Sequence, residues 1–114
     1  MNKNETYLLD ILQGKWRVTI IEAMLHTGPR QFADLKADVE GISAKVLTEN
    51  LYFFIKCGIV SKKSYPVFPP KTEYSLTDKG QKIGPILNEI YRWSVENYAP
   101  PTEKVKDDFY SVFK

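Results

Sequence analysis

The spacing of the apolar residues changes at Gly58, and this change constrains the fold more than any other feature of the sequence. Before Gly58 the apolar residues recur every three or four positions, which is the period of an amphipathic helix. After it, residues 59–65 and 71–76 have the pattern of two strands. The proline-rich segment 66–70 between them cannot be helical, because proline fixes φ and lacks a backbone N–H. We therefore expect an α+β chain that is mainly helical and carries one two-stranded hairpin.

Helical periodicity and capping residues set the expected helices. They cover residues 6–12, 15–26, 32–39, 43–57 and 78–98. Ser43 is a good N-cap for the fourth helix, and Ile42 and Leu47 occupy the positions of a hydrophobic staple. Thr77 caps the last and longest helix, in which Pro85 should introduce a kink or delay the regular part. The three helices that directly precede the hairpin have the order of a winged helix-turn-helix, since the last two of them are joined by a short glycine-containing turn.

Length and composition indicate one globular unit. A chain of 114 residues is close to the size of one domain, so we expect a single domain with a core at about 5–98 and an amphipathic extension at about 100–114. The one cysteine excludes an internal disulfide and suits a reducing compartment. No apolar run approaches the roughly 20 residues that cross a bilayer, and no signal-peptide stretch follows the N-terminus. We expect a cytoplasmic protein without a membrane partner.

The fourth helix is expected to have one buried and one free face. Leu47 and Leu51 belong to the buried face, whereas Lys45, Glu49 and Tyr52 recur at intervals of three and four on the opposite one. A helix with a free polar face fits the major groove of B-DNA, where base edges present a readable pattern of donors and acceptors. Double-stranded DNA is therefore the expected partner.

The hairpin adds a local positive charge that the net charge of +2 hides. It has three lysines and no acidic residue from Ser61 to Thr72, which suits a wing lying beside a phosphate backbone. The residues expected to contact DNA are Ser43, Ala44, Lys45, Thr48, Glu49 and Tyr52 of the helix, Lys62, Lys63 and Lys71 of the hairpin, and Arg30 near them.

Other interpretations of these residues stay open at this point. The hairpin lysines could serve only to keep a strand edge soluble, and the polar helix face could simply be solvated. Arg30 is as easily a surface charge as a phosphate contact. The alternative function is a winged-helix module for protein–protein contact without DNA binding, which the low net charge and the acidic Glu49 favour.

The sequence offers no residues for catalysis or for a cofactor. One histidine and one cysteine cannot supply a metal cluster with plausible spacing. Neither a glycine-rich phosphate loop nor a nucleophile elbow is present. Cys57, between a helix end and a glycine, is interpreted as a small buried residue rather than a redox sensor. We expect a protein that is not an enzyme and binds no metal.

Several ungapped blocks resemble the HxlR-type regulators, a MarR-like family of bacterial transcription factors. They are LQGKW at 12–16, GPRQFADL at 28–35, GISAKVLT at 41–48 and YPVFPPKTEYSLTDKG at 65–80, and the likeness extends to Trp93. The resemblance implies a homodimer, joined through its first and last helices, that binds an operator with inverted symmetry. Members that sense oxidants carry a cysteine just before the first helix, where this chain has Asn2, Lys3 and Asn4. A thiol switch at that position is therefore excluded.

The last helix also carries more apolar side chains than one small domain can cover, which marks an association surface. The residues expected at the dimer interface are Tyr7, Leu8 and Ile11 of the first helix and Ile83, Leu87, Ile90 and Tyr91 of the last. A pocket for a small-molecule effector among the aromatic side chains is a further open alternative.

Overall fold

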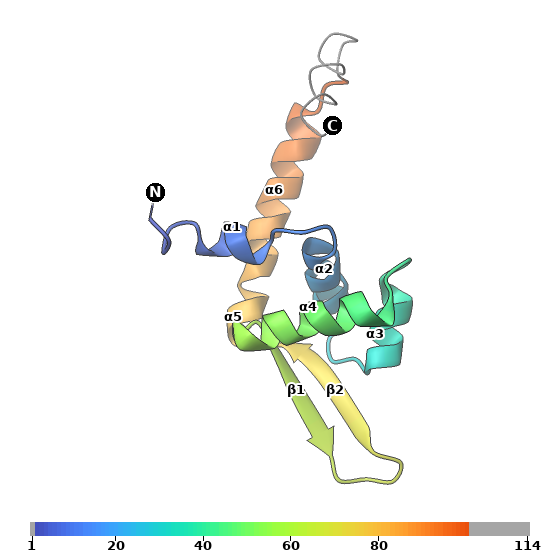
Figure 1. Cartoon of the computed structure of the whole chain (residues 1–114). Coiled ribbons are helices and arrows are strands. Elements are labelled where there is room, and N and C mark those ends of the chain that lie inside the picture. The colour runs from blue at the N-terminus through green and yellow to red at the C-terminus, as the bar shows by residue number, and fades with distance from the viewer. Residues whose placement is uncertain (1, 101–114) are drawn as a thin grey trace. The chain divides into compact units, whose positions relative to one another are not determined.

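The computed structural model describes residues 2–100, and its elements follow the expected order (Figure 1). They are α1 (Tyr7–Ile11), α2 (Arg17–Thr27), α3 (Phe32–Asp38), α4 (Ala44–Lys56), β1 (Val60–Tyr65), β2 (Lys71–Leu76), α5 (Asp78–Gln81) and α6 (Ile83–Asn97). The chain divides into two compact units after Gly84. The predicted fold class, mainly helical with a two-stranded antiparallel wing, is confirmed. The expected extension at 100–114 lies almost wholly outside the described residues.

An entirely apolar core holds the first unit together. α2 and α4 contribute buried residues spaced by three or four, α1 and α3 contribute one buried residue each, and the chain entering β1 completes the core. The buried set includes Ile20, Ile21 and Met24 of α2, Leu35 of α3, Leu47, Leu51 and Phe54 of α4, and Ile59 and Val60. Among residues 2–100, no polar or charged residue is buried, so the polar side chains lie at the surface, where they can contact a partner.

The turn between α3 and α4 fixes the start of α4. Gly41 has φ of +85°, a left-handed conformation that favours glycine. Two residues later, the Ser43 hydroxyl accepts a hydrogen bond from the Val46 N–H at 3.1 Å, which confirms the predicted N-cap. Ile42 and Leu47 are both buried at the two staple positions. The sequence of this turn therefore determines where α4 begins.

The β1–β2 hairpin extends away from the helices of the first unit (Figure 1). Its register pairs Lys62 with Tyr74 and Lys63 with Glu73. Because successive side chains of a strand point to opposite faces, Lys62 and Lys63 lie on different sides of the wing. At the base of the wing, the Arg30 N–H donates to the Tyr74 carbonyl at 2.9 Å and the Tyr74 N–H donates to the Arg30 carbonyl at 2.8 Å.

The expected single helix over 78–98 is two helices, with an interruption at Lys82. Thr77 caps α5, as predicted, by accepting from the Gly80 N–H at 3.1 Å. The regular helix then restarts at Ile83, which places Pro85 in the first turn of α6, where a missing N–H breaks no helical hydrogen bond. The prediction of one continuous helix was therefore wrong, and the predicted disturbance by Pro85 is confirmed.

The second unit begins at Pro85 and contains most of α6. Ile86, Ile90 and Trp93 are spaced by four and three residues, so they share one face of the helix, and all three are exposed. None of the helices within residues 2–100 is long and apolar enough to cross a membrane.

Candidate nucleic-acid interface

The polar face of α4 collects all the helix residues that the sequence predicted. Lys45, Thr48, Glu49 and Tyr52 are exposed, as are Ser43 and Ala44 at the start of the helix, whereas the opposite face is buried. The Thr48 hydroxyl donates to the Ala44 carbonyl at 2.8 Å, which leaves its oxygen free to accept from a ligand. Within residues 2–100, Lys45 has no carboxylate partner. This face therefore offers a cation, a hydroxyl and a carboxylate on a rigid helix.

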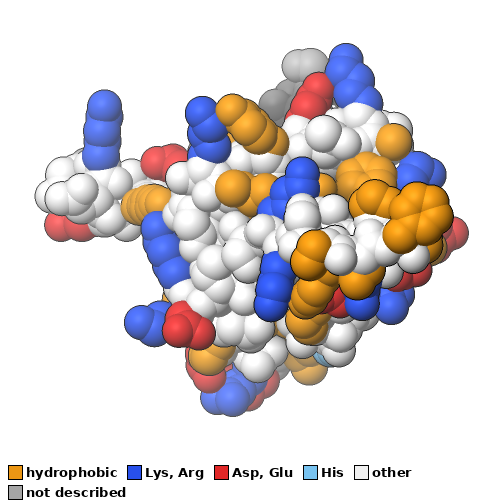
Figure 2. Space-filling model, turned by 90° about the horizontal axis from the view of Figure 1, so that it is seen from below, with side chains coloured by type: hydrophobic (Ala, Val, Ile, Leu, Met, Phe, Trp, Pro, Cys, Tyr) orange, Lys and Arg blue, Asp and Glu red, His pale blue; other side chains and the backbone are white. Residues whose placement is uncertain are grey.

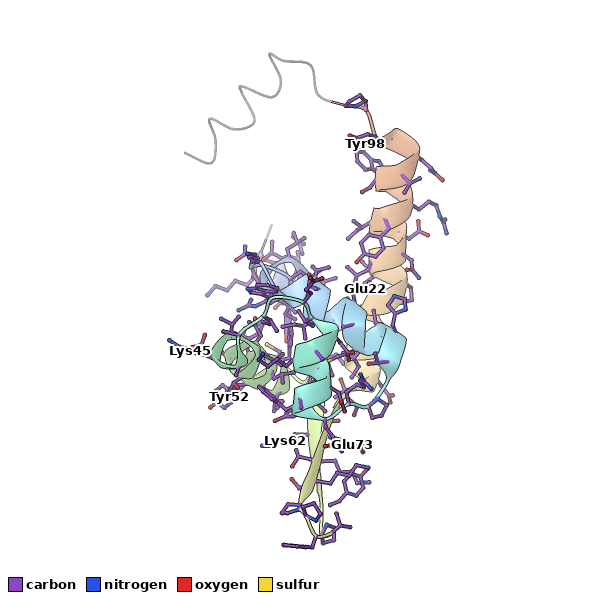
Figure 3. All side chains as sticks on the ribbon, turned by 90° about the vertical axis from the view of Figure 1, so that its right-hand side faces the viewer. Glu22, Lys45, Tyr52, Lys62, Glu73 and Tyr98 are labelled. Carbon is purple, nitrogen blue, oxygen red and sulfur yellow. The ribbon has the colours of Figure 1, made fainter. Side chains whose placement is uncertain are left out.

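The wing continues this face through Lys62. A small cavity of about 110 Å³ lies where α4 meets the wing. Its lining consists of Thr48, Leu51, Tyr52, Ile55, Lys62 and Tyr74. The Lys62 ammonium lies 5.9 Å from the centre of the Tyr74 ring. In Figure 3, Lys45, Tyr52 and Lys62 lie on the same side of the first unit, and Glu73 lies on the other side of the wing.

Tyr74 and the apolar residues of this cavity were not predicted as part of the site. Tyr74 belongs there because the strand register places it opposite Lys62 on the same face of the wing. Strand alternation alone could have paired these two side chains, once the length of the turn was known.

The other face of the wing is more balanced in charge than the sequence suggested. Lys63 and Lys71 lie 4.9 Å and 5.3 Å from the centre of the Tyr65 ring. Lys71 also forms an ion pair with Glu73 at 3.7 Å. A hydrogen bond with the Glu73 carboxylate raises the pKa of the Tyr65 phenol above its ordinary value. Of the three wing lysines predicted to contact DNA, Lys62 adjoins the polar face of α4, and Lys63 and Lys71 lie on the other face of the wing.

Arg30 is engaged within the protein. Its guanidinium donates two hydrogen bonds to the Asp38 carboxylate, both at 2.9 Å. This bidentate pair raises the pKa of Arg30 further above its ordinary value. Arg30, whose backbone is hydrogen-bonded to Tyr74 of the wing, is thereby connected to Asp38 at the end of α3. Arg30 therefore has a structural role in the free protein.

The residues predicted for the dimer interface differ in how exposed they are to solvent. Ile11 and Ile83 are buried within the first unit and act there as core residues, and Leu87 of the second unit is also buried. Leu8 is half-buried, whereas Tyr7, Ile90 and Tyr91 are exposed. Further exposed apolar residues are Ile86 and Trp93, which belong to the surplus of apolar side chains expected on the last helix, and Leu9 of α1.

Cys57 lies half-buried at the end of α4, with its backbone held in place. The Lys79 ammonium donates to the Cys57 carbonyl at 2.7 Å and to the Tyr7 hydroxyl at 3.0 Å. Within residues 2–100, no group of histidine, cysteine or carboxylate side chains could hold a metal ion.

Figure 2 shows the molecule from the end where the wing lies. Lys and Arg side chains are interspersed with hydrophobic side chains on this face rather than gathered into one patch. A mixed surface of this kind can contact both phosphates and the apolar parts of a nucleic acid.

The chain matches the HxlR-like helix-turn-helix family over residues 11–102. It is 41% identical over 91 residues to the uncharacterized HTH-type transcriptional regulator BH0655 of Halalkalibacterium halodurans, with 80% of each chain covered. It is 39% identical over 92 residues to the uncharacterized HTH-type transcriptional regulator YvaP of Bacillus subtilis, with 81% of this chain and 84% of YvaP covered.

The structure is similar to the reduced form of the transcriptional regulator YodB from B. subtilis, with a TM-score of 0.80 and 26% identity. That similarity covers 90% of this chain and 99% of the YodB chain. All three relatives are transcriptional regulators and none is an enzyme. With the family match extending over most of its length and the winged fold in agreement, the chain belongs to the HxlR-like helix-turn-helix family.

Proposed function

We propose that this protein regulates transcription by binding duplex DNA as a homodimer at a pseudo-palindromic operator. The observation that carries the proposal is the free polar face of α4, which is continuous with Lys62 of the wing. An α-helix fits the major groove, and a cationic wing beside it neutralises the flanking phosphates. Family membership supports the same function.

The residues of this face have different roles in the proposed complex. Ser43 and Ala44 place the N-terminal amides of a 13-residue helix toward a phosphate, and Lys45 adds a charge beside them. Thr48 and Glu49 are placed to contact base edges, and a carboxylate there can accept from the amino group of cytosine. Lys62 contacts the backbone phosphate next to the groove.

The dimer holds two copies of α4 at the spacing of the operator half-sites. Half-sites one helical turn apart are separated by about 34 Å, which requires a stiff interface between the protomers. The exposed stripe of Ile86, Ile90 and Trp93 on α6 supplies apolar surface for that interface, and Tyr91 extends it. In the first unit, Tyr7 of α1 is a predicted interface residue that is also exposed.

The proposal is tested by fluorescence anisotropy with a duplex from upstream of the protein's own gene. If each protomer neutralises about three or four phosphates, affinity should fall with salt with a log–log slope of about −5 to −7. Selection of binding sites with Thr48→Ala and Glu49→Gln should then change the preferred bases, at about 1–3 kcal/mol per affected pair.

A second candidate function is a winged-helix module that contacts another protein. Two observations favour it: Glu49 is exposed within the polar face of α4, and Glu73 partly neutralises Lys71 on the wing. A protein that fails to bind any duplex at low salt, while remaining folded and dimeric, would support this module instead.

A further inference from the structure

The tip of the wing exposes a large aromatic side chain. Phe68 is 98% exposed and its neighbour Val67 is 54% exposed, at the end of a hairpin that projects from the helices. A phenyl group that contacts almost nothing in its own protomer contributes nothing to folding. Its exposure therefore fits an apolar group that is used in binding.

The tip is stiff, so little ordering is needed when it binds. Pro66 precedes Val67, and Pro69 and Pro70 follow Phe68, which restricts the backbone on both sides. The Val67 N–H donates to the Tyr65 carbonyl at 2.9 Å and closes a tight turn. A side chain presented on a restricted backbone binds with a smaller loss of conformational entropy than one on a flexible loop.

The length of the wing matches the spacing of the DNA grooves. Each strand has six residues, which span about 20 Å at the rise of an extended strand. Along B-DNA, the centre of the minor groove lies about half a helical turn, roughly 17 Å, from the centre of the major groove. With α4 in the major groove, the tip reaches the adjacent minor groove.

The charges near the tip are compatible with that position. No acidic residue occurs between Ser61 and Thr72, so the tip can pass between two phosphate backbones without carboxylate repulsion. Lys62 lies on the strand behind the tip, on the α4 side of the wing, where it can contact the phosphate backbone next to the groove. The tip itself is uncharged and apolar, as is typical of side chains that enter the minor groove as wedges.

We infer that Phe68 enters the minor groove flanking each operator half-site and partly unstacks one base step there, bending the duplex. This inference rests on the proposed function and adds a specificity-determining residue to it. A wedge is best accommodated by flexible pyrimidine–purine steps such as TA, because these steps unstack most easily. The flank of the operator therefore contributes to specificity through its deformability rather than through base-edge hydrogen bonds.

The experiment compares wild type, Phe68→Ala, Phe68→Leu and the matched control Val67→Ala on one operator duplex. Phe68→Ala should weaken binding about tenfold for each half-site, the expected order for the loss of one base-stacking contact, and therefore about 100-fold for the dimer. The variant should also abolish two signals. One is the bend, measured by energy transfer between the duplex ends, and the other is the rise in 2-aminopurine fluorescence that reports unstacking at the flanking step. Phe68→Leu should keep most of the bend, because leucine is also an effective wedge. Val67→Ala should behave as wild type.

A stiff A-tract in place of the flanking TA step should weaken the wild type and leave Phe68→Ala unchanged. Wild-type bending and affinity in Phe68→Ala would overturn the inference while leaving the proposed function intact. Loss of self-association in Phe68→Ala, with unchanged DNA bending, would show instead that the tip contacts a second protein copy. A wild type that binds no duplex would overturn the inference together with the proposed function.

Discussion

Lys62 and Lys63 are adjacent in the sequence and identical in charge, yet the structure predicts different effects when each is replaced by alanine. Lys62 lies on the α4 side of the wing and lines the cavity with Tyr52. Lys63 lies on the opposite side, over the Tyr65 ring. Because only one side of the wing adjoins the polar face of α4 that we propose contacts DNA, Lys62→Ala should weaken DNA binding much more than Lys63→Ala.

The magnitude follows from counterion release. Each phosphate contact contributes about 0.9 to the log–log salt slope, so losing Lys62 from both protomers should reduce the slope by about 1.8. Between about 50 and 200 mM salt, a fourfold change, the ratio of wild-type to variant affinity should then shrink by about 12-fold. The loss should be similar for specific and random duplexes, because phosphate contacts carry no sequence information.

Fluorescence anisotropy titrations of wild type, Lys62→Ala and Lys63→Ala over this salt range provide the measurement. The Lys63→Ala protein has the same net charge as the Lys62→Ala protein, so it controls for a general electrostatic effect. Equal slopes and equal affinity losses in the two variants would refute the assignment of one face of the wing to DNA.

Three further predictions concern the dimer, the fold and the thiol. Ile90→Asp should dissociate the dimer in sedimentation velocity, because Ile90 lies on the apolar stripe of α6 and is 48% exposed. Val95→Asp should leave the dimer intact, because Val95 lies on the opposite face of α6 and is 81% exposed. A wild type that is monomeric at micromolar concentration would contradict this interface. Gly80→Ala should lower the free energy of unfolding by about 1–3 kcal/mol in urea denaturation, because a Cβ there would collide with the Ile59 carbonyl oxygen; unchanged stability would contradict this packing. Cys57→Ser should leave operator affinity unchanged with and without peroxide, and an oxidant response that vanishes in this variant would show that the thiol is a sensor.

Local signals in the sequence were sufficient for much of the fold. Ser43 specifies the start of α4 because its hydroxyl satisfies a free N–H of the first turn, and this chemistry needs no tertiary information. The prolines between residues 66 and 70 likewise confine the chain to a turn between two strands. The helix residues of the candidate site follow from the same local logic, because helical periodicity alone separates a buried face from a free one.

The rest depends on which residues the tertiary structure brings together. Arg30 and Asp38 are eight residues apart and form a bidentate pair only because the α2–α3 turn and the end of α3 approach each other. Similarly, Glu73 is outside the acid-free stretch of the wing in sequence, but antiparallel pairing places it opposite Lys63. Gly80 packs closely on the Ile59 carbonyl, a contact between segments about 20 residues apart that periodicity cannot detect.

The two backbone hydrogen bonds between Arg30 and Tyr74 make the wing a lever whose pivot is the α2–α3 turn. These bonds involve main-chain atoms, so most side-chain substitutions leave them intact, and the Ile59 N–H, which donates to the Phe54 carbonyl at 2.8 Å, holds the start of β1 to α4 as well. From Tyr74 to the tip, the arm is roughly 15 Å long at the rise of an extended strand, so a rotation of about 10° at the pivot moves the tip by about 2–3 Å. A displacement of that size is enough to break a contact between the tip and a groove, because hydrogen bonds and van der Waals contacts are lost over such distances. A small rearrangement of the helices near Arg30 would therefore be amplified at the far end of the wing.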